Sequence, residues 1–322
     1  MNEFELIDRH FRREPRNADV RIGIGDDGAV FAPSPGMEYV VTVDMLVENR
    51  HFSAGGDPRA LGHKALAVNL SDLAAMGALP RFALLAGALP DADAAWVAEF
   101  MRGFDALASE YDVELIGGDT TRGPRTLCIT AIGELPSGTA LRRNGASPGD
   151  IVYVSGELGD AALALAAKAG RTEIEPAALQ ALERRLDRPQ PRVALGVALR
   201  GVASAALDVS DGLTGDLGHV LAASRVGATL ELAAIPCGDE LRARVTGPER
   251  TLALRCLLAG GDDYELCFTA SPARRERVDT IALALGLPLT PIGTITVDAG
   301  LSVRDEHGKA LPALPRAFDH FA

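Results

Sequence analysis

The sequence predicts an α+β fold with two domains, and three observations carry this prediction. The chain has 322 residues, which is long for a single hydrophobic core. Hydrophobic residues make up 47% of it and charged residues only 24%, so there is enough apolar material for two cores. Strand-like and helix-like segments alternate without forming strict βαβ units, which favours the α+β class.

The first domain is predicted over residues 1–148. A buried strand is expected at 37–46, with Asp44 at its end, and an Ala/Leu-rich helix at 58–76, with Gly77 as its C-cap. A short strand at 113–116 should run straight into a glycine-rich acidic loop. The remaining elements expected here are strands at 82–89 and 126–135 and a helix at 93–110.

The second domain, predicted over residues 149–322, begins after a turn at 147–150. The polar stretch 170–190 should mix helix and loop. Strands are expected at 151–155, 205–209, 229–232, 265–269 and 291–296. Helices are expected at 159–169, 192–199, 213–224 and 272–285.

Charge argues against a nucleic-acid partner. The formal net charge is −12 and no Lys/Arg-rich run is present, whereas a nucleic-acid binder needs a basic surface to neutralise phosphates. Only three of the 32 basic residues are lysine, so a direct phosphate contact would come from an arginine. An acidic protein that handles phosphate esters would need divalent metal ions to offset the repulsion.

The sequence also predicts a soluble cytoplasmic protein that does not engage a membrane. The four cysteines form no C-x-x-C pair, which indicates reduced, buried thiols. Residues 1–13 have no apolar core typical of a signal peptide, and the longest apolar runs are too short to span a bilayer.

The main chemical signal is a set of acidic segments, most of them flanked by glycine. Hard divalent cations bind oxygen ligands, and Mg²⁺ takes one or two carboxylates together with water and phosphate oxygens. Carboxylates without His or Cys partners indicate Mg²⁺ or Mn²⁺ in preference to Zn²⁺. Any one Asp-Gly segment is more often a simple turn, and six together weaken that interpretation without excluding it. They are 25–28, 42–44, 69–72, 117–123, 208–212 and 260–263.

Asp72 is the most informative single residue. It lies in an apolar helical stretch beside Asn69 and Ser71, where a solvated helix would carry more charge. A carboxylate in a mostly buried helix needs a partner or a metal ion. Asp72 is therefore expected to be functional.

Common nucleotide-binding motifs do not explain the chain. Residues 23–28 match G-x-G-x-x-G, but Asp26 and Asp27 would repel a pyrophosphate, and prolines follow where a helix is required. Neither the P-loop nor the protein-kinase signature is present. His51, Arg122 and Arg143 could contact a substrate or be ordinary structural or solvated side chains.

Six stretches resemble the thiamine-monophosphate kinase family: GIGDDGAV (23–30), TVDMLVENRHF (42–52), KALAVNLSDLAAMGA (64–78), IGGDTTRG (116–123), DVSDGLTGDLGH (208–219) and GGDDYELCFT (260–269). The wider superfamily includes aminoimidazole ribonucleotide synthetase and selenophosphate synthetase. The resemblance implies two α+β domains, an N-terminal sheet that forms a barrel across a homodimer interface, and a C-terminal mixed sheet with helices. ATP would bind near that interface.

The resemblance also implies roles for individual residues. Several Mg²⁺ ions would be held by Asp27, Thr42, the Val43 carbonyl, Asp44, Asp72, Asp119, Asp208 and Asp211. ATP would contact Gly118, Asp119, Arg143 and Ser210, and thiamine monophosphate would contact His51, Asp262 and Phe318. Two positions depart from the family, which often has Glu at the position of Asp262 and Tyr or Trp at that of Phe318.

The implied reaction is direct in-line transfer from ATP to thiamine monophosphate, giving thiamine diphosphate. Two alternatives remain. The first is another ATP-dependent enzyme of the superfamily, with a purine-pathway ribonucleotide or selenide as substrate, although a selenide enzyme should carry a reactive Cys near its N-terminus and the first one here is Cys128. The second is a non-catalytic Mg-nucleotide-binding protein.

Overall fold

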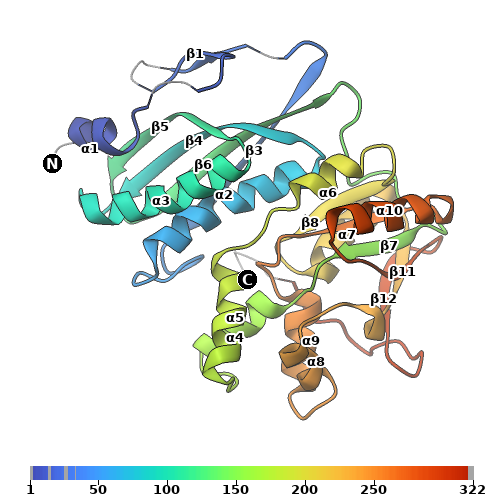
Figure 1. Cartoon of the computed structure of the whole chain (residues 1–322). Helices are drawn as coiled ribbons and strands as arrows, with labels where there is room; N and C mark the ends of the chain where they lie inside the picture. The colour runs from blue at the N-terminus through green and yellow to red at the C-terminus, as the bar shows by residue number, and fades with distance from the viewer. Residues whose placement is uncertain (1–2, 14–15, 25–27, 33, 318–322) are drawn as a thin grey trace. The chain divides into compact units, whose positions relative to one another are not determined.

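The computed structural model describes residues 3–13, 16–24, 28–32 and 34–317. The chain divides into two compact units. Unit 1 comprises residues 1–73 and 78–140, and unit 2 comprises residues 74–77 and 141–322. Each unit has its own sheet, and helices and strands are mixed in both, so the α+β prediction is confirmed (Figure 1).

Unit 1 is built on a four-stranded sheet of order β3-β6-β4-β5, in which only β4 and β5 are parallel. Helices α2 and α3 lie along one face of this sheet (Figure 1). A small apolar cluster containing Val20, Phe82 and Ile132 covers part of the other face. The elements are α1 Glu3–His10, β1 Val20–Ile22, β2 Val30–Phe31, β3 Met37–Val47, α2 Pro58–Ala75, β4 Leu79–Leu89, α3 Ala94–Glu110, β5 Glu114–Arg122 and β6 Thr126–Pro136.

Two glycines allow α2 and α3 to approach backbone to backbone. A Cβ added to Gly62 would lie 1.9 Å from the Phe100 carbonyl oxygen, and one added to Gly103 would lie 1.8 Å from the Arg59 carbonyl oxygen. Any side chain at either position would overlap the neighbouring helix. The glycines therefore set the separation of the two helices.

The prediction of a buried strand ending on Asp44 was wrong in two respects. Strand β3 continues to Val47, so Asp44 lies within it. β3 is also an edge strand, and Val41, Val43 and Met45 are 61%, 59% and 56% exposed. An unbroken apolar run is typical of a strand covered on both faces. In this chain alone, one face of β3 is left uncovered.

Strand β5 is longer than predicted. Gly117, Gly118 and Asp119 belong to the strand rather than to a loop after it. The glycines suggested a loop, but here Gly118 allows close approach of the paired strand. A Cβ on Gly118 would lie 1.9 Å from the Leu85 carbonyl oxygen.

Unit 2 is built on a six-stranded mixed sheet of order β12-β9-β11-β7-β10-β8, in which only β12 and β9 are parallel. Its core includes Val152, Leu207 and Ile292. The strands are β7 Ile151–Ser155, β8 Ala205–Val209, β9 Gly227–Glu231, β10 Glu265–Ala270, β11 Leu289–Thr296 and β12 Gly300–Arg304. The helices are α4 Asp160–Lys168, α5 Pro176–Asp187, α6 Val193–Ala198, α7 Leu213–Ser224, α8 Asp239–Val245, α9 Arg250–Ala259 and α10 Arg275–Leu285, with short 3-10 turns at Leu232–Ala234 and Pro272–Arg274.

All four cysteines are free thiols, as predicted, but only three of them are buried. Cys237, Cys256 and Cys267 are buried in unit 2, and Cys128 is partly buried on β6 of unit 1. Within the described residues, none of the helices combines the length and apolar character needed to cross a bilayer.

Candidate functional site

In unit 1, α2 and β3 bring three of the expected metal ligands to one junction. Thr42 Oγ1 donates a hydrogen bond to Asp72 Oδ2. One helical turn away, the Asp44 backbone N–H donates to Asn69 Oδ1 at 3.0 Å. Spacings of two on a strand and three on a helix each keep residues on one face. The structure therefore brings Thr42, Asp44 and Asp72 together.

Asn69 explains why this junction is well defined. Its side chain is fully buried, and its amide also donates to the Ala65 carbonyl at 3.1 Å. The amide thus bridges the backbone of α2 and the backbone of β3. Asn69 was noticed in the sequence as a companion of Asp72 but was given no role.

Gly118 and Asp119 lie on the opposite edge of the same sheet. The register runs from Asp44 through Ile129 on β6 and Leu85 on β4 to Gly118 on β5. Three interstrand spacings of about 4.8 Å separate β3 from β5, which is about 14 Å. Within one chain, the sheet does not bring Asp119 to Asp44.

His51 lies in a tight turn that follows β3. The Val47 backbone N–H donates to His51 Nδ1 at 2.9 Å. Because Nδ1 accepts this bond, the neutral ring carries its hydrogen on Nε2. The turn is held by Arg125, which pairs with Glu48 and lies 4.5 Å from the centre of the Trp96 ring.

In unit 2, Asp208 is buried at the next-to-last position of β8, and Ser210 and Asp211 come directly after the strand. The backbone N–H groups of Ser210, Asp211 and Gly212 all donate to Asp216 Oδ2, at 3.0, 3.0 and 3.1 Å. Burial raises the pKa of Asp216 to about 6, although these N–H bonds act in the opposite direction. Sequence reasoning missed Asp216. An acid in the first turn after Ser-Asp-Gly is the signal that could have found it.

The segment 260–264 packs against this loop. The Asp262 N–H donates to the Ser210 carbonyl at 2.9 Å, and the Tyr264 N–H donates to the Val209 carbonyl at 2.8 Å. A Cβ on Gly261 would lie 2.3 Å from the Ser210 carbonyl oxygen, so only glycine fits there. The structure therefore places Asp262 beside Ser210.

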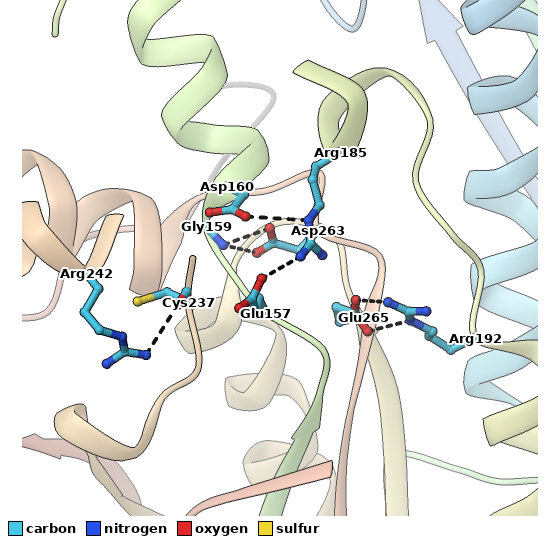
Figure 2. Close-up of polar contacts among 9 residues, drawn as sticks. All are labelled: Glu157, Gly159, Asp160, Arg185, Arg192, Cys237, Arg242, Asp263 and Glu265. Atoms are coloured by element: carbon cyan, nitrogen blue, oxygen red, sulfur yellow. Dashed lines mark hydrogen bonds and ion pairs between the residues drawn. The ribbon is translucent and has the colours of Figure 1, made fainter. Parts of the chain in front are cut away.

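Asp262 and Tyr264 both have positive φ, 69° and 51°. Such values are uncommon for residues other than glycine and indicate a backbone held in place by its surroundings. Between them, Asp263 points inward, and the Gly159 N–H donates to its two carboxylate oxygens at 2.9 and 3.0 Å (Figure 2). Burial raises the pKa of Asp263 well above its usual value.

Three ion pairs, made by two arginines, lie around this buried acid. Arg185 binds Glu157 at 2.6 Å and lies 3.6 Å from Asp160 (Figure 2). Arg192 forms a two-point pair with Glu265, with Nε at 2.7 Å from Oε2. Burial raises the pKa of Glu265, and the Arg192 pair partly offsets the rise. These contacts stabilise the strand ends that carry the site.

Arg143 is not brought to Ser210. Its carbonyl accepts a hydrogen bond from Ser224 Oγ, at the last residue of α7, at 3.1 Å. Ser210 lies before the other end of this helix, and a helix of that length spans about 16 Å. The Arg143 side chain is exposed and therefore belongs to a different part of the surface of unit 2.

Two of the expected site residues, Asp27 and Phe318, lie outside the described residues. Among the residues that are described, three or more His, Cys, Asp or Glu side chains nowhere gather closely enough to enclose a metal ion. A Mg²⁺ site does not require such a cluster, since substrate phosphates and water complete its coordination. Thr42, Asp44 and Asp72 offer the oxygen donors that Mg²⁺ prefers.

Comparison with known proteins places this geometry in a family. Residues 25–135 match the family model "AIR synthase related protein, N-terminal domain", and residues 147–306 match "AIR synthase related protein, C-terminal domain". The thiamine-monophosphate kinase of Escherichia coli (strain K12) is 46% identical over 325 residues, with 99% of this chain and 98% of the relative covered.

Solved structures agree. Thiamine-monophosphate kinase from Stenotrophomonas maltophilia K279a is 47% identical, with a TM-score of 0.86 and 96% of this chain and 98% of that chain covered. AaThiL complexed with AMPPCP and TMP is 31% identical, with a TM-score of 0.78 and 90% and 89% covered. Sequence and fold agree over nearly the whole length, so this chain belongs to the thiamine-monophosphate kinase family of enzymes.

Proposed function

We propose that this chain transfers the γ-phosphoryl group of ATP to thiamine monophosphate and releases ADP and thiamine diphosphate. The observation that carries the proposal is the junction of Thr42, Asp44 and Asp72, where α2 and β3 present oxygen donors to one place. Family membership supplies the substrate class, since a relative of the same fold binds AMPPCP and TMP.

The donor set suits Mg²⁺. In unit 1, Asp44 and Asp72 provide carboxylates, Thr42 a hydroxyl and Val43 a carbonyl; Asp27 would join them. In unit 2, Asp208 and Asp211 provide a second group of carboxylates. Bound Mg²⁺ would screen the repulsion between donor and acceptor phosphates and hold them in line.

The residues of this chain have little proton transfer to perform. A phosphate monoester has its second pKa near 6, so the acceptor oxygen is largely ionised at neutral pH. The protein's task is to position two anions and exclude unproductive geometries. We assign ATP contacts to Gly118, Asp119, Arg143 and Ser210; Arg143, which lies near the far end of α7 from Ser210, would contact a different part of the nucleotide.

We assign thiamine monophosphate contacts to His51, Asp262 and Phe318. His51 is suited to donate a hydrogen bond from Nε2, because Val47 occupies Nδ1. Asp262 is joined to Ser210 through its backbone, so the substrate contact and the ATP contact share one rigid segment of unit 2.

The two edges of the unit 1 sheet favour a homodimer. β3 and β5 each pair on one side only among the described residues, and β3 carries the exposed apolar side chains Val41, Val43 and Met45. An open edge with an apolar stripe is a site for pairing with another chain. Pairing β3 with β5 of a second copy would close a barrel and bring Asp119 of that copy toward Asp44.

In this arrangement residues 1–148 form the ATP- and Mg²⁺-binding dimerisation domain, and residues 149–322 complete the substrate site. The free thiols suit a reducing, cytoplasmic compartment.

The test is release of ADP from Mg-ATP with and without thiamine monophosphate, in the wild type, Asp72→Asn and Asp112→Asn. Asp112 is an exposed acid of unit 1 with positive φ, which Asn also tolerates, so it is a matched control. We expect release that requires thiamine monophosphate and falls at least about 100-fold in Asp72→Asn only. ADP release driven instead by a purine ribonucleotide or selenide would refute thiamine monophosphate as the substrate. ATP binding without turnover would refute the proposed catalytic activity.

A further inference from the structure

The loop after β8 resembles a phosphate-binding loop, but a side chain of the protein occupies the position that a phosphate would take. Three successive N–H groups, from Ser210, Asp211 and Gly212, turn to one side immediately before α7. Such N–H groups at the start of a helix commonly bind phosphate. Here all three donate to Asp216 Oδ2, on a side chain that is only 6% exposed.

The loop is also fixed from the other side. Gly212 has a φ of 112°, and a Cβ there would lie 2.6 Å from the backbone of Ala259 at the end of α9. Thr214 Oγ1 donates to the Leu258 carbonyl at 2.8 Å. Asp216 on one side and α9 on the other hold the loop in this conformation. That shape leaves the side chains, and not the N–H groups, of Ser210 and Asp211 for a ligand.

We propose that Asp216 is a positioning residue for nucleotide binding. It occupies the anion-binding place formed by residues 210–212, so ATP phosphates reach this loop through Mg²⁺ and the side chains of Ser210 and Asp211. The inference rests on the proposed function, because that function assigns ATP and Mg²⁺ to this loop. It adds that the nucleotide has no metal-independent route to the loop's N–H groups.

The first test needs no variant. Binding of AMPPCP and of inorganic pyrophosphate to the full chain is measured by calorimetry in excess Mg²⁺ and in EDTA. Amide resonances of residues 210–212 are followed in parallel. We expect AMPPCP to bind only with Mg²⁺ and pyrophosphate in EDTA to leave these amides unchanged. Metal-free binding that shifts these three amides would overturn the proposal.

The second test compares Asp216→Ala, Asp216→Asn and Asp239→Ala. Asn keeps an oxygen acceptor for the three N–H groups, and Asp239 is an exposed acid in the first turn of α8 of the same unit. In Asp216→Ala we expect the Mg²⁺ concentration for half-maximal AMPPCP binding to rise at least 10-fold, and hydrogen exchange of amides 210–212 to accelerate at least 100-fold. Asp216→Asn should stay within about threefold of wild type, and Asp239→Ala should not differ.

The outcomes separate this inference from the proposed function. If exchange at residues 210–212 accelerates in Asp216→Ala but AMPPCP binding keeps its Mg²⁺ dependence, Asp216 has only a structural role and the proposal fails. If Asp216→Ala does not fold, Asp216→Asn decides the question. A rise of 10-fold or more in its Mg²⁺ concentration for half-maximal AMPPCP binding would contradict the proposal. A chain that binds Mg-AMPPCP but does not turn over thiamine monophosphate refutes the proposed function and leaves this inference intact.

Discussion

The two units hold their site carboxylates in different ways. In unit 1, Asp44 and Asp72 are part of a strand and a helix, and the separation of those elements determines where the carboxylates lie. In unit 2, Asp211 and Asp262 lie in loops. Those loops are held by two further carboxylates, Asp216 and Asp263, which turn inward and accept backbone N–H groups.

The difference teaches that an acidic sequence motif can contain two kinds of acid. One kind is the kind that we propose for ligand binding, and the other accepts backbone N–H groups inside the protein. The geometry of unit 1 should be sensitive to changes in element packing. The geometry of unit 2 should be sensitive to the hydrogen bonds that its buried acids accept.

The largest effect is expected from Gly103→Val on α3. The new side chain would overlap the Arg59 carbonyl, which a Cβ alone approaches to 1.8 Å, and would push α2 and its Asp72 away. Unit 1 should lose more than about 3 kcal/mol of its free energy of unfolding, measured by urea denaturation. Ala106→Val, at an exposed position of the same helix, should lower the free energy of unfolding by only a few tenths of a kcal/mol. Equal losses in both variants would show that the glycine contact does not set the helix separation.

Asp160 probes the buried acids of unit 2. Burial raises its pKa from 3.8 to about 6, with Arg185 opposing the rise and Glu157 adding to it. The folded state therefore holds the proton more tightly than the unfolded state, and the carboxylate lowers stability as pH rises through this interval. Above about pH 6 the cost is complete, up to about 3 kcal/mol.

Asp160→Asn removes this titration. Relative to the wild type, the variant should be equally stable near pH 3, below both pKa values, and more stable by up to about 3 kcal/mol near pH 8. Urea unfolding at both pH values measures the difference. A difference that does not change with pH would show that burial does not disfavour the charged form of Asp160.

The smallest effect concerns the open edge of unit 1. Val41→Glu places a charge on the exposed apolar stripe of β3, which we expect to weaken self-association at least about 10-fold, or about 1.4 kcal/mol. Leu283→Glu, at an 85% exposed position on α10 of unit 2, is the control and should not change association. Sedimentation velocity distinguishes the two. A wild-type chain that sediments as a monomer would remove the dimer from the proposed function.

Most elements with a strong pattern could be predicted from the sequence. The helix expected at 58–76 is α2 Pro58–Ala75, and the strand expected at 265–269 is β10 Glu265–Ala270. Helix α9 was missed because its own residues are apolar on most of its faces, which obscures the helical period. The short elements α1, α8, β1, β2 and β12 were also missed.

The site was predictable in its chemistry more than in its geometry. The sequence indicated that Asp72 needs a partner, and the structure supplies Thr42. It could not show that Asp119 lies across the sheet from Asp44, because strand order depends on long-range pairing. It also could not separate Asp262, which neighbours Ser210, from Asp263, which is buried against Gly159, since both read as one acidic motif.

The positions of the four cysteines should give the two units different rates of thiol alkylation. Burial raises the pKa of Cys256 to about 11 and that of Cys267 to about 12, and the thiolate is the reactive form. An alkylating reagent would therefore modify these two, and the buried Cys237, only when unit 2 opens, whereas the partly buried Cys128 reports on unit 1. The rate of alkylation at these buried thiols would therefore report how often the parts of unit 2 that cover them open.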